Sequence, residues 1–327
     1  MLVLSEKDIQ NNYFIEDAIT DVRKGLISIN KGLINSPHRT IIDISQHQAS
    51  VLYMPSADLS QEIASMKVVS IFPENPKQGK PTTQGVLLLT DAKTGEHLCM
   101  MSASYLTRLR TGALSGIGTE KLARTNSNRL GIIGTGAMAS EQVLGVLAVR
   151  KIESIQLFNR TTKNAEKFKE RLVEYGVKQD ITIVKNVDKL VQSVDILCCS
   201  TRSNNPVFNG ELLKTGTHIN GVGSYLPHMR EVDLATIQRA SKIVVDSLNG
   251  VKEEAGELIH ANRESEWSFS DIYADLSELC DHSQLVREKD EEITFFKSVG
   301  AAYFDLAVAQ GVYLKAKKLK FGSLAEI

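Results

Sequence analysis

Residues 129–140 read Arg-Leu-Gly-Ile-Ile-Gly-Thr-Gly-Ala-Met-Ala-Ser, a short apolar run that enters a glycine turn and continues into a helical pattern. Gly134 suits the tight turn, and Gly136 lets the backbone approach a pyrophosphate at the amino terminus of the following helix. Ala139 takes the third small position, where helix and strand pack closely. The motif alone is weak, but an apolar helical stripe follows it and residues 154–158 suit the next strand. We therefore predict a dinucleotide-binding turn rather than an ordinary glycine-rich corner.

The chain beyond residue 126 alternates between strand-like and helix-like segments. This alternation is typical of a Rossmann-type, doubly wound parallel sheet, which has a crevice at the carboxyl ends of its strands. We expect strands at residues 130–133, 155–158, 181–184, 195–200, 218–222 and 243–246, and helices around residues 137–150, 162–175, 187–192 and 230–240.

The chain before that region follows a different pattern, in which one amphipathic helix precedes several alternating strands. This order predicts a separate α+β unit. A long amphipathic helix near the end of the chain is expected to return to this first unit. The expected segments are a helix at 15–32, strands within 39–54 and 66–72, a hairpin at 85–102, a helix rich in small residues at 103–122 and the last helix at 301–318.

The composition is that of an ordinary globular protein with about two domains. Of the 327 residues, 42% are hydrophobic and 24% are charged, and the formal net charge is −1. This balance argues against nucleic acid or an anionic membrane as a partner. No apolar run approaches the roughly 20 residues of a membrane-spanning helix. A signal peptide is not expected either, because no basic stretch followed by an apolar one begins the sequence.

Cysteine and histidine usage predicts no metal site, because neither the four cysteines nor the seven histidines have metal-ligand spacing. Cys198 and Cys199 lie in an apolar, strand-like run and are expected to be core thiols. This pattern fits a reducing, cytoplasmic location.

The end of the second expected strand indicates which nicotinamide nucleotide binds. A carboxylate usually follows that strand in NAD-selective folds, where it binds the ribose 2′-hydroxyl. Here the strand is followed by Asn159, Arg160 and Thr161, which can donate hydrogen bonds to a 2′-phosphate. We therefore expect NADPH to be preferred, with NADH possible. The alternative for Arg160 is an ordinary solvated loop arginine.

The first unit offers cations for catalysis or binding. Lys67 lies in an apolar strand, where it either faces solvent or is buried with a lowered pKa that suits proton transfer. Arg110 lies near the start of a helix, where the helix dipole does not favour a cation, so an anion-binding role is expected. Arg39 is ambiguous by itself. Two arginines and a lysine that converge on a nicotinamide would suit a small carboxylate substrate.

Several motifs together make the chain similar to the ornithine cyclodeaminase/mu-crystallin family over nearly its whole length. They are Met66-Lys67-Val68-Val69, the residues 85–91, Arg108-Leu109-Arg110-Thr111-Gly112-Ala113, the glycine turn at 131–136, Asn220-Gly221-Val222-Gly223-Ser224 and Phe296-Lys297-Ser298-Val299-Gly300. The resemblance implies a substrate-binding and dimerisation domain (1–118 plus 301–327), a Rossmann domain inserted between its parts (119–300) and a homodimer.

The resemblance also implies roles for single residues. Arg39, Lys67 and Arg110 would hold a substrate carboxylate, with Lys67 and Arg110 as the catalytic pair and Lys67 as the proton donor. Residues implied at the cofactor are Thr82 near the nicotinamide or its phosphates, Ala137 and Met138 over the pyrophosphate, Ser200, Thr201 and Val222 on the nicotinamide side, and Val299 with Gly300 closing the pocket.

One position departs from part of the family. Its ornithine cyclodeaminases and archaeal-type alanine dehydrogenases carry an aspartate shortly after the Gly-Val-Gly turn, where this chain has Tyr225. A tyrosine, with a pKa of about 10, is no carboxylate base at neutral pH. The resemblance therefore implies NAD(P)H-dependent reduction of a cyclic ketimine, with Tyr225 beside the ring. Δ1-Pyrroline-2-carboxylate would give L-proline, and Δ1-piperideine-2-carboxylate could give L-pipecolate.

Two other functions stay open at this point. Ornithine cyclodeamination would release ammonia from ornithine without net consumption of the cofactor, and the aspartate missing at position 225 argues against it. A non-enzymatic, NADPH-dependent small-ligand carrier of the mu-crystallin type would bind the cofactor without turnover.

Overall fold

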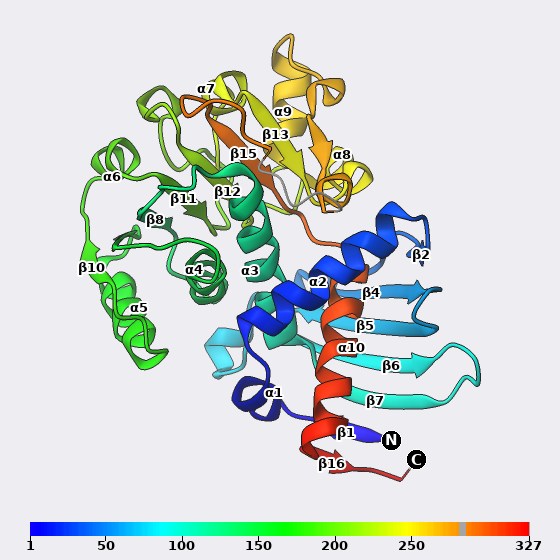
Figure 1. Ribbon diagram of the computed structural model, residues 1–327. Coiled ribbons are helices and arrows are strands. Elements are labelled where there is room, and N and C mark those ends of the chain that lie inside the picture. Colours follow the sequence, from blue (N-terminus) through cyan, green and yellow to red (C-terminus); the bar gives the residue numbers. More distant parts are fainter. Residues whose placement is uncertain (281–285, 327) are drawn as a thin grey trace. The chain divides into compact units, whose positions relative to one another are not determined.

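The computed structural model describes residues 1–280 and 286–326. The chain forms two compact units, which we describe separately (Figure 1). Unit 1 comprises Met1–Arg110 and Ala301–Ile327, and unit 2 comprises Thr111–Gly300. The chain passes from unit 1 to unit 2 inside helix α3 (Ala103–Leu122), after Arg110 rather than after residue 118.

Unit 1 is a mostly antiparallel sheet with two long helices across one face (Figure 1). The strand order is β16-β1-β7-β6-β5-β4-β2, and β3 pairs with β4. The strands are β1 (Leu2–Leu4), β2 (Ile34–Asn35), β3 (Thr40–Ile44), β4 (Ala49–Asp58), β5 (Ile63–Ile71), β6 (Thr83–Asp91), β7 (His97–Ser102) and β16 (Ser323–Leu324), and the helices are α1 (Glu6–Asn12), α2 (Ile15–Asn30) and α10 (Ala302–Leu319).

The two ends of the chain meet in this sheet, because β1 pairs antiparallel with β16 and parallel with β7. The last helix therefore belongs to unit 1, as expected from its position beyond the parallel strands. Local sequence starts the helices: Ser5 and Asp8 form a capping box at α1, in which the Ser5 side chain accepts from the Asp8 N–H at 3.1 Å.

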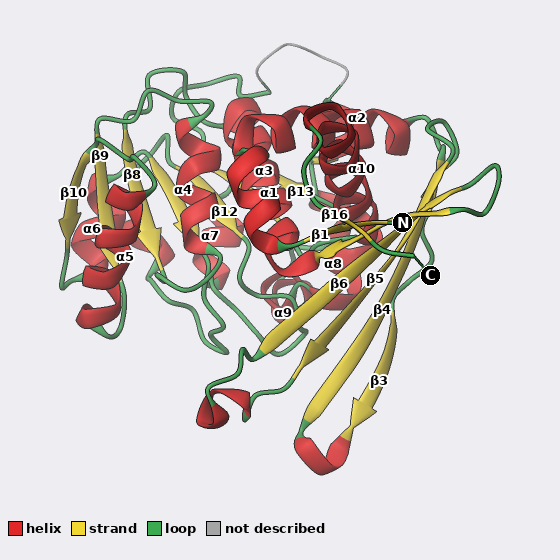
Figure 2. Cartoon of the chain, turned by 90° about the horizontal axis from the view of Figure 1, so that it is seen from below, coloured by secondary structure: helices red, strands yellow, loops and turns green. Residues whose placement is uncertain are grey.

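Unit 2 is a parallel sheet with helices on its faces (Figures 1 and 2). The strand order is β10-β9-β8-β11-β12-β15-β13-β14, so the order reverses between β8 and β11. The strands are β8 (Arg129–Ile133), β9 (Ser154–Phe158), β10 (Asp180–Ile183), β11 (Ile196–Cys199), β12 (His218–Gly221), β13 (Lys242–Val245), β14 (Ala274–Asp275) and β15 (Thr294–Lys297). The helices are α4 (Ala139–Leu147), α5 (Thr162–Glu174), α6 (Val187–Ser193), α7 (Leu234–Arg239), α8 (Leu248–Glu254) and α9 (Gly256–Glu264).

The Rossmann-type fold is thus confirmed, and the six expected strands all form. The sequence pattern missed β15, which lies between β12 and β13 although it follows both in the chain. All four residues of β15 are buried. Such a strand shows no alternation of apolar and polar residues, which is the pattern that would have marked it in the sequence.

Small residues let helices α3 and α4 approach closely within unit 2. A Cβ at Gly112 would lie 2.2 Å from the carbonyl oxygen of Glu141, and one at Gly145 would lie 2.0 Å from that of Gly112. Neither position has room for a side chain. This explains why a helix at this place is rich in glycine, alanine and serine.

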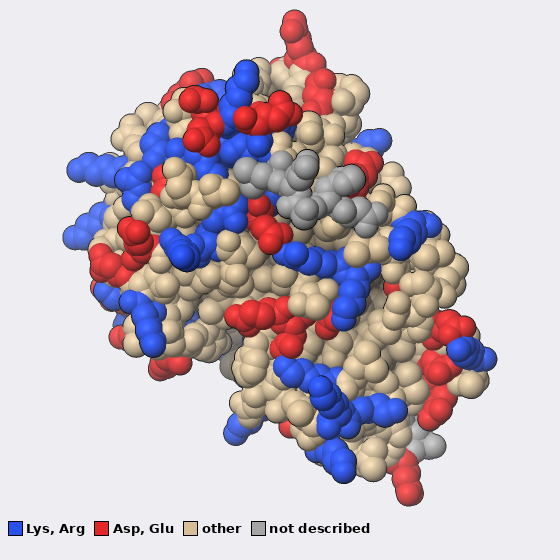
Figure 3. Space-filling model, viewed as in Figure 1, with Lys and Arg blue, Asp and Glu red and all other residues tan. Residues whose placement is uncertain are grey.

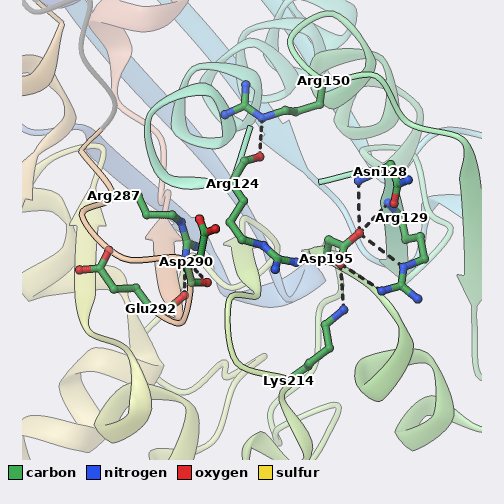
Figure 4. A network of polar contacts seen from close by, with 9 residues as sticks. All are labelled: Arg124, Asn128, Arg129, Arg150, Asp195, Lys214, Arg287, Asp290 and Glu292. Atoms are coloured by element: carbon green, nitrogen blue, oxygen red, sulfur yellow. Dashed lines mark hydrogen bonds and ion pairs between the residues drawn. The ribbon is translucent and has the colours of Figure 1, made fainter. Parts of the chain in front are cut away.

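A single carboxylate ties together the amino-terminal edge of the parallel sheet (Figure 4). Asp195, whose side chain is 4% exposed, accepts from Lys214 Nζ at 2.8 Å, Arg124 Nη2 at 3.0 Å and Arg129 Nη2 at 3.3 Å. It also accepts from the backbone N–H groups of Asn128 and Arg129. Asp195 therefore joins the start of β11 to the segment that enters β8.

Two arginines cover the carboxyl end of α3, where carbonyl groups lack helical partners. Arg150 and Arg287 donate to backbone oxygens there, and Arg150 also reaches the carbonyl of Arg124 (Figure 4). Arg150 binds the carbonyls of Thr119, Glu120 and Ala123, the residue after the helix, and Arg287 binds that of Leu122.

Positive and negative side chains are interspersed over the face drawn in Figure 3, in keeping with a net charge of −1. Across residues 1–280 and 286–326, none of the helices is both long and apolar enough to cross a membrane.

Candidate functional site

Unit 1 brings Lys67 and Arg110 to one buried carboxylate, Asp305. Lys67 on β5 donates from Nζ to Asp305 Oδ2 at 2.5 Å, and Arg110 Nε lies 3.5 Å from Asp305 Oδ1. The side chains of Lys67, Arg110 and Asp305 are 3%, 8% and 1% exposed. Thr107 donates its hydroxyl to Asp305 Oδ1 at 3.2 Å. Lys67 is therefore buried, and the solvent-facing alternative for this residue is wrong.

Burial lowers the pKa of Lys67 to about 8. The charge of Asp305 opposes this effect, whereas the charges of Arg110 and Arg39 add to it. The pKa of Asp305 is lowered: burial raises it, but Lys67 and Arg110 outweigh burial. At neutral pH the cluster therefore contains an ammonium that can release a proton readily and a carboxylate that stays charged.

Arg110 lies two turns inside α3, since the helix begins at Ala103. The helix has the expected bounds, but the argument from the helix dipole does not apply to Arg110, because the dipole acts mainly within the first turn. Its burial beside Asp305 is the better reason to assign it a function. Arg39 is half-buried, just before β3, and its charge acts on Lys67.

The glycine turn of unit 2 has the geometry of a dinucleotide cradle. Gly134 has φ +89°, and a Cβ there would lie 2.6 Å from Thr201 Cγ2. A Cβ at Gly136, in contrast, would have no neighbouring atom within 4 Å, so this side of the turn is open. Ser200 Oγ donates to the Gly134 carbonyl at 3.0 Å, whereas the buried Thr135 hydroxyl has no hydrogen-bond partner among the described residues. The open turn and the free hydroxyl fit a pyrophosphate at the start of α4.

The other residues expected at this turn differ in exposure. Ala137 is exposed, and Met138 is half-buried and caps α4. Arg160 and Thr161 are exposed, but the amide of Asn159 is already engaged. Asn159 accepts from the Thr135 N–H at 3.2 Å and donates to the Thr161 carbonyl at 3.0 Å. Asn159 therefore links the glycine turn to the loop after β9.

Two buried carboxylates hold the loops at the carboxyl ends of β11, β12 and β15. Glu231 accepts from Thr201 N at 2.5 Å and Thr201 Oγ1 at 2.8 Å, and from Gly223 N at 2.7 Å. Asp246 accepts from Ser298 Oγ at 2.6 Å and from the N–H groups of Val299 and Gly300. Thr201 and Val299, both expected at the cofactor, are thus fixed by acids that the sequence analysis did not identify.

A fully buried ion pair supports the segment before Tyr225. Lys297 Nζ lies 3.1 Å from Glu257 Oε1 and donates to Ser224 O and Oγ at 2.6 Å each. Ser224 Oγ donates to Glu257 at 2.8 Å. Val222 is buried, and Tyr225 is half-buried next to this fixed serine. The sequence does contain a signal for this ion pair, because Lys297 lies in an apolar strand. The same feature identified Lys67 as a candidate.

His218, Cys198 and Cys199 have structural roles. His218 is buried between Thr294 and Asn220, and burial lowers its pKa to about 3, so it stays neutral. Cys198 and Cys199 are buried in β11, as expected, and burial raises the pKa of both thiols. Thr82 is half-buried in unit 1, where its carbonyl accepts from Phe72 N–H at 2.8 Å.

The sequence is similar to known proteins over its full length. A profile of the ornithine cyclodeaminase/mu-crystallin family matches residues 1–320. A Δ1-pyrroline-2-carboxylate reductase of Bacillus cereus is 39% identical over 326 residues, 100% of both chains. An alanine dehydrogenase of Archaeoglobus fulgidus is 31% identical and covers 98% of this chain and 97% of its own length.

Solved structures agree with this similarity. Thermococcus litoralis Δ1-pyrroline-2-carboxylate reductase, in complex with NADH and L-proline, has a TM-score of 0.94 at 37% identity and covers 99% of this chain and 100% of its own. An archaeal alanine dehydrogenase dimer with bound NAD has a TM-score of 0.91 at 30% identity, with 100% and 99% covered.

Proposed function

Because the chain belongs to the ornithine cyclodeaminase/mu-crystallin family, we propose that it reduces Δ1-pyrroline-2-carboxylate to L-proline with a nicotinamide cofactor. The observation that carries this proposal is the buried cluster of Lys67, Arg110 and Asp305. In this cluster the Lys67 ammonium can release a proton, and the net charge is positive. The named relatives at 39% and 37% identity support the same substrate. Δ1-Piperideine-2-carboxylate is the second ring to test.

The cations of unit 1 bind the ring carboxylate and supply the proton. Arg110 faces Asp305 through Nε, and we assign its two terminal nitrogens to bidentate binding of the ring carboxylate. Arg39 is the second carboxylate ligand. Lys67 donates a proton to the ring nitrogen, whose C=N bond becomes a single bond as the ring carbon is reduced. A lysine with a pKa of about 8 is mostly protonated at neutral pH yet releases its proton readily.

Unit 2 would hold the nucleotide, whose chemistry when bound is to supply a hydride. Gly134, Gly136, Ala137 and Met138 are assigned to the pyrophosphate, and Ser200, Thr201, Val222 and Val299 to the nicotinamide side. Tyr225 is assigned to the substrate ring. Thr82 is assigned to the cofactor as well.

We infer that NADPH is preferred, although the solved neighbours bind NADH or NAD. Support comes from the loop after β9, where Arg160 and Thr161 are exposed and no carboxylate would repel a 2′-phosphate. Asn159 contributes by holding this loop on the glycine turn. NADH stays the alternative cofactor.

The protein is also proposed to be a homodimer, through the sheet face of unit 1 that faces away from α2 and α10. Pro55, Met66, Leu88, Met100 and Val3 are successive cross-strand neighbours in one row. Met66 is 37% and Met100 38% exposed. Leu87 and Leu89, on either side of Leu88 along β6, are fully buried on the other face of the sheet. Such a continuous apolar surface is typical of a subunit interface.

The four free cysteines suit a cytoplasmic location.

The test follows nicotinamide absorbance with purified protein and freshly made Δ1-pyrroline-2-carboxylate, with the six-membered ring and both nucleotides in parallel. We expect nucleotide oxidation with formation of proline, and faster turnover with NADPH than with NADH. If neither nucleotide is oxidised, the reductase proposal is wrong, and ammonia release from ornithine then identifies a cyclodeaminase. Tight NADPH binding without any turnover would indicate a carrier.

A further inference from the structure

Asp305 is a buried carboxylate in an otherwise apolar stretch of α10. Phe304, Leu306 and Val308 around it in the sequence are buried hydrophobic residues. Asp305 lies in the first turn of this helix, where the N–H groups favour a negative charge. The fold therefore keeps an ionised acid inside unit 1.

The carboxylate divides its two oxygens between different partners. Oδ2 binds the ammonium of Lys67 at 2.5 Å, and Oδ1 accepts from Thr107 at 3.2 Å and faces Arg110 Nε at 3.5 Å. Within the described residues, Asp305 is the hydrogen-bond partner of Lys67 Nζ, so two of the three N–H directions of this ammonium are left for a ligand. One side chain thus fixes the orientation of both cations.

Stability alone does not account for this arrangement. Removing two charges from water costs several kcal/mol per ion, and well-packed apolar residues often replace a buried ion pair without loss of stability. The retained charges therefore point to a role in the chemistry of the site.

We propose that Asp305 is a positioning residue of the reductase, which fixes Lys67 Nζ as a charged proton donor and turns the terminal nitrogens of Arg110 toward the substrate carboxylate. This inference rests on the proposed function. The three cations Lys67, Arg110 and Arg39 outnumber the one carboxylate of Asp305, so the cluster keeps a net positive charge that attracts the substrate carboxylate. Without Asp305, Lys67 would face the positive charges of Arg110 and Arg39 in a buried place and would lose its proton more easily.

The first test is the pH dependence of kcat/KM in Asp305→Asn, which keeps the shape and an acceptor oxygen but removes the charge. In the parent, kcat/KM is expected to fall as the pH rises through about 8, where Lys67 loses its proton. In Asp305→Asn this fall should begin about one pH unit lower or more. The loss should thus exceed about tenfold at pH 8.5 and shrink to a few-fold at pH 6. A fall at the parent's pH would overturn the inference.

Asp305→Glu tests position separately from charge, and it answers the question if Asp305→Asn does not fold. It keeps the negative charge but moves the carboxylate by one methylene, so the fall in kcat/KM should stay near the parent's pH. The value of kcat should drop about tenfold or more, because the ammonium and guanidinium are displaced. Parent-like kcat in Asp305→Glu contradicts a positioning role.

A third measurement does not depend on turnover. Lysine labelled with 13C at Cε gives a resonance for Lys67 that is assigned by its absence in Lys67→Met, and its titration can be followed by NMR. We expect its midpoint to be lower in Asp305→Asn than in the parent, even if the substrate has been misidentified. Equal midpoints refute the inference while leaving the reductase activity intact.

Asp17→Asn is the matched control, because Asp17 on α2 pairs at 2.6 Å with Lys315, which lies on α10 like Asp305. This variant should change neither the titration nor the pH profile.

Discussion

At the scale of single residues, the site depends on the environment of one ammonium. An exposed lysine is almost fully protonated at neutral pH and releases its proton reluctantly, whereas burial brings the pKa of Lys67 to about 8. The same burial requires a counter-charge, which Asp305 provides at 2.5 Å. Reactivity and the need for a partner therefore have one physical cause.

Lys67→Met is expected to reduce kcat about 10²–10⁴-fold, the usual contribution of a general acid. NADPH should still bind, because Lys67 is not among the residues assigned to the nucleotide, all of which except Thr82 belong to unit 2. Stopped-flow or steady-state absorbance gives the rate, and cofactor fluorescence gives the binding. Lys93→Met, which removes an exposed lysine paired with Glu62, is the control with unchanged turnover. Unchanged turnover in Lys67→Met would remove Lys67 from the mechanism.

At the scale of elements, the contact between α3 and α4 is set by backbone rather than by side chains. Gly145→Ala would place a Cβ 2.0 Å from the carbonyl oxygen of Gly112, so the two helices must separate. We expect a loss of about 1–3 kcal/mol in the free energy of unfolding, measured by urea denaturation. Gly136→Ala, whose new Cβ meets no atom within 4 Å, should change stability far less. Equal losses in both variants would show that the close approach is not the cause.

The start of β11 depends on Asp195 in a pH-dependent way. Burial raises the pKa of this carboxyl, but hydrogen bonds from Lys214 and Arg129 outweigh burial and bring it to about 2. A depressed folded-state pKa stabilises the fold above the unfolded value of about 3.9, and this contribution is lost as the pH falls toward 2.

Asp195→Asn should therefore lower the free energy of unfolding at pH 7 by about 1–2 kcal/mol, a modest value because its partner cations are partly exposed. Urea denaturation at several pH values should show parent and variant converging as the pH falls from 5 toward 3. A constant difference over this range would contradict the assignment.

Sequence periodicity predicted the elements better than it predicted the site. The alternation beyond residue 126 was enough to identify the parallel strands, because each is followed by a helix or a turn signal. Strand β15 was missed, since a short buried run carries no period of its own. The acids Asp305, Glu231 and Glu257 were missed for a related reason: each acts on residues distant in sequence. Their partners are set by tertiary contacts that no local pattern contains.

At the scale of the whole molecule, the order of the chain explains the two units. Residues from both ends build unit 1, and β1 and β16 pair at the edge of its sheet. The proposal of a Rossmann domain inserted into a substrate-binding and dimerisation domain follows this division. The helical face of the unit 1 sheet is covered by α2 and α10, so the proposed homodimer would form through the opposite, apolar face.

Light scattering coupled to size-exclusion chromatography should give the mass of a dimer for the parent. Met100→Lys together with Val86→Lys places two charges on the exposed apolar face, where these side chains are 38% and 48% exposed. Burying such charges against a second copy is unfavourable without counter-charges, so the variant should elute as a monomer. Val173→Lys, which replaces a valine of α5 that is 59% exposed, should leave the mass unchanged. A monomeric parent would exclude the homodimer, and a dimeric double variant would exclude this face as its interface.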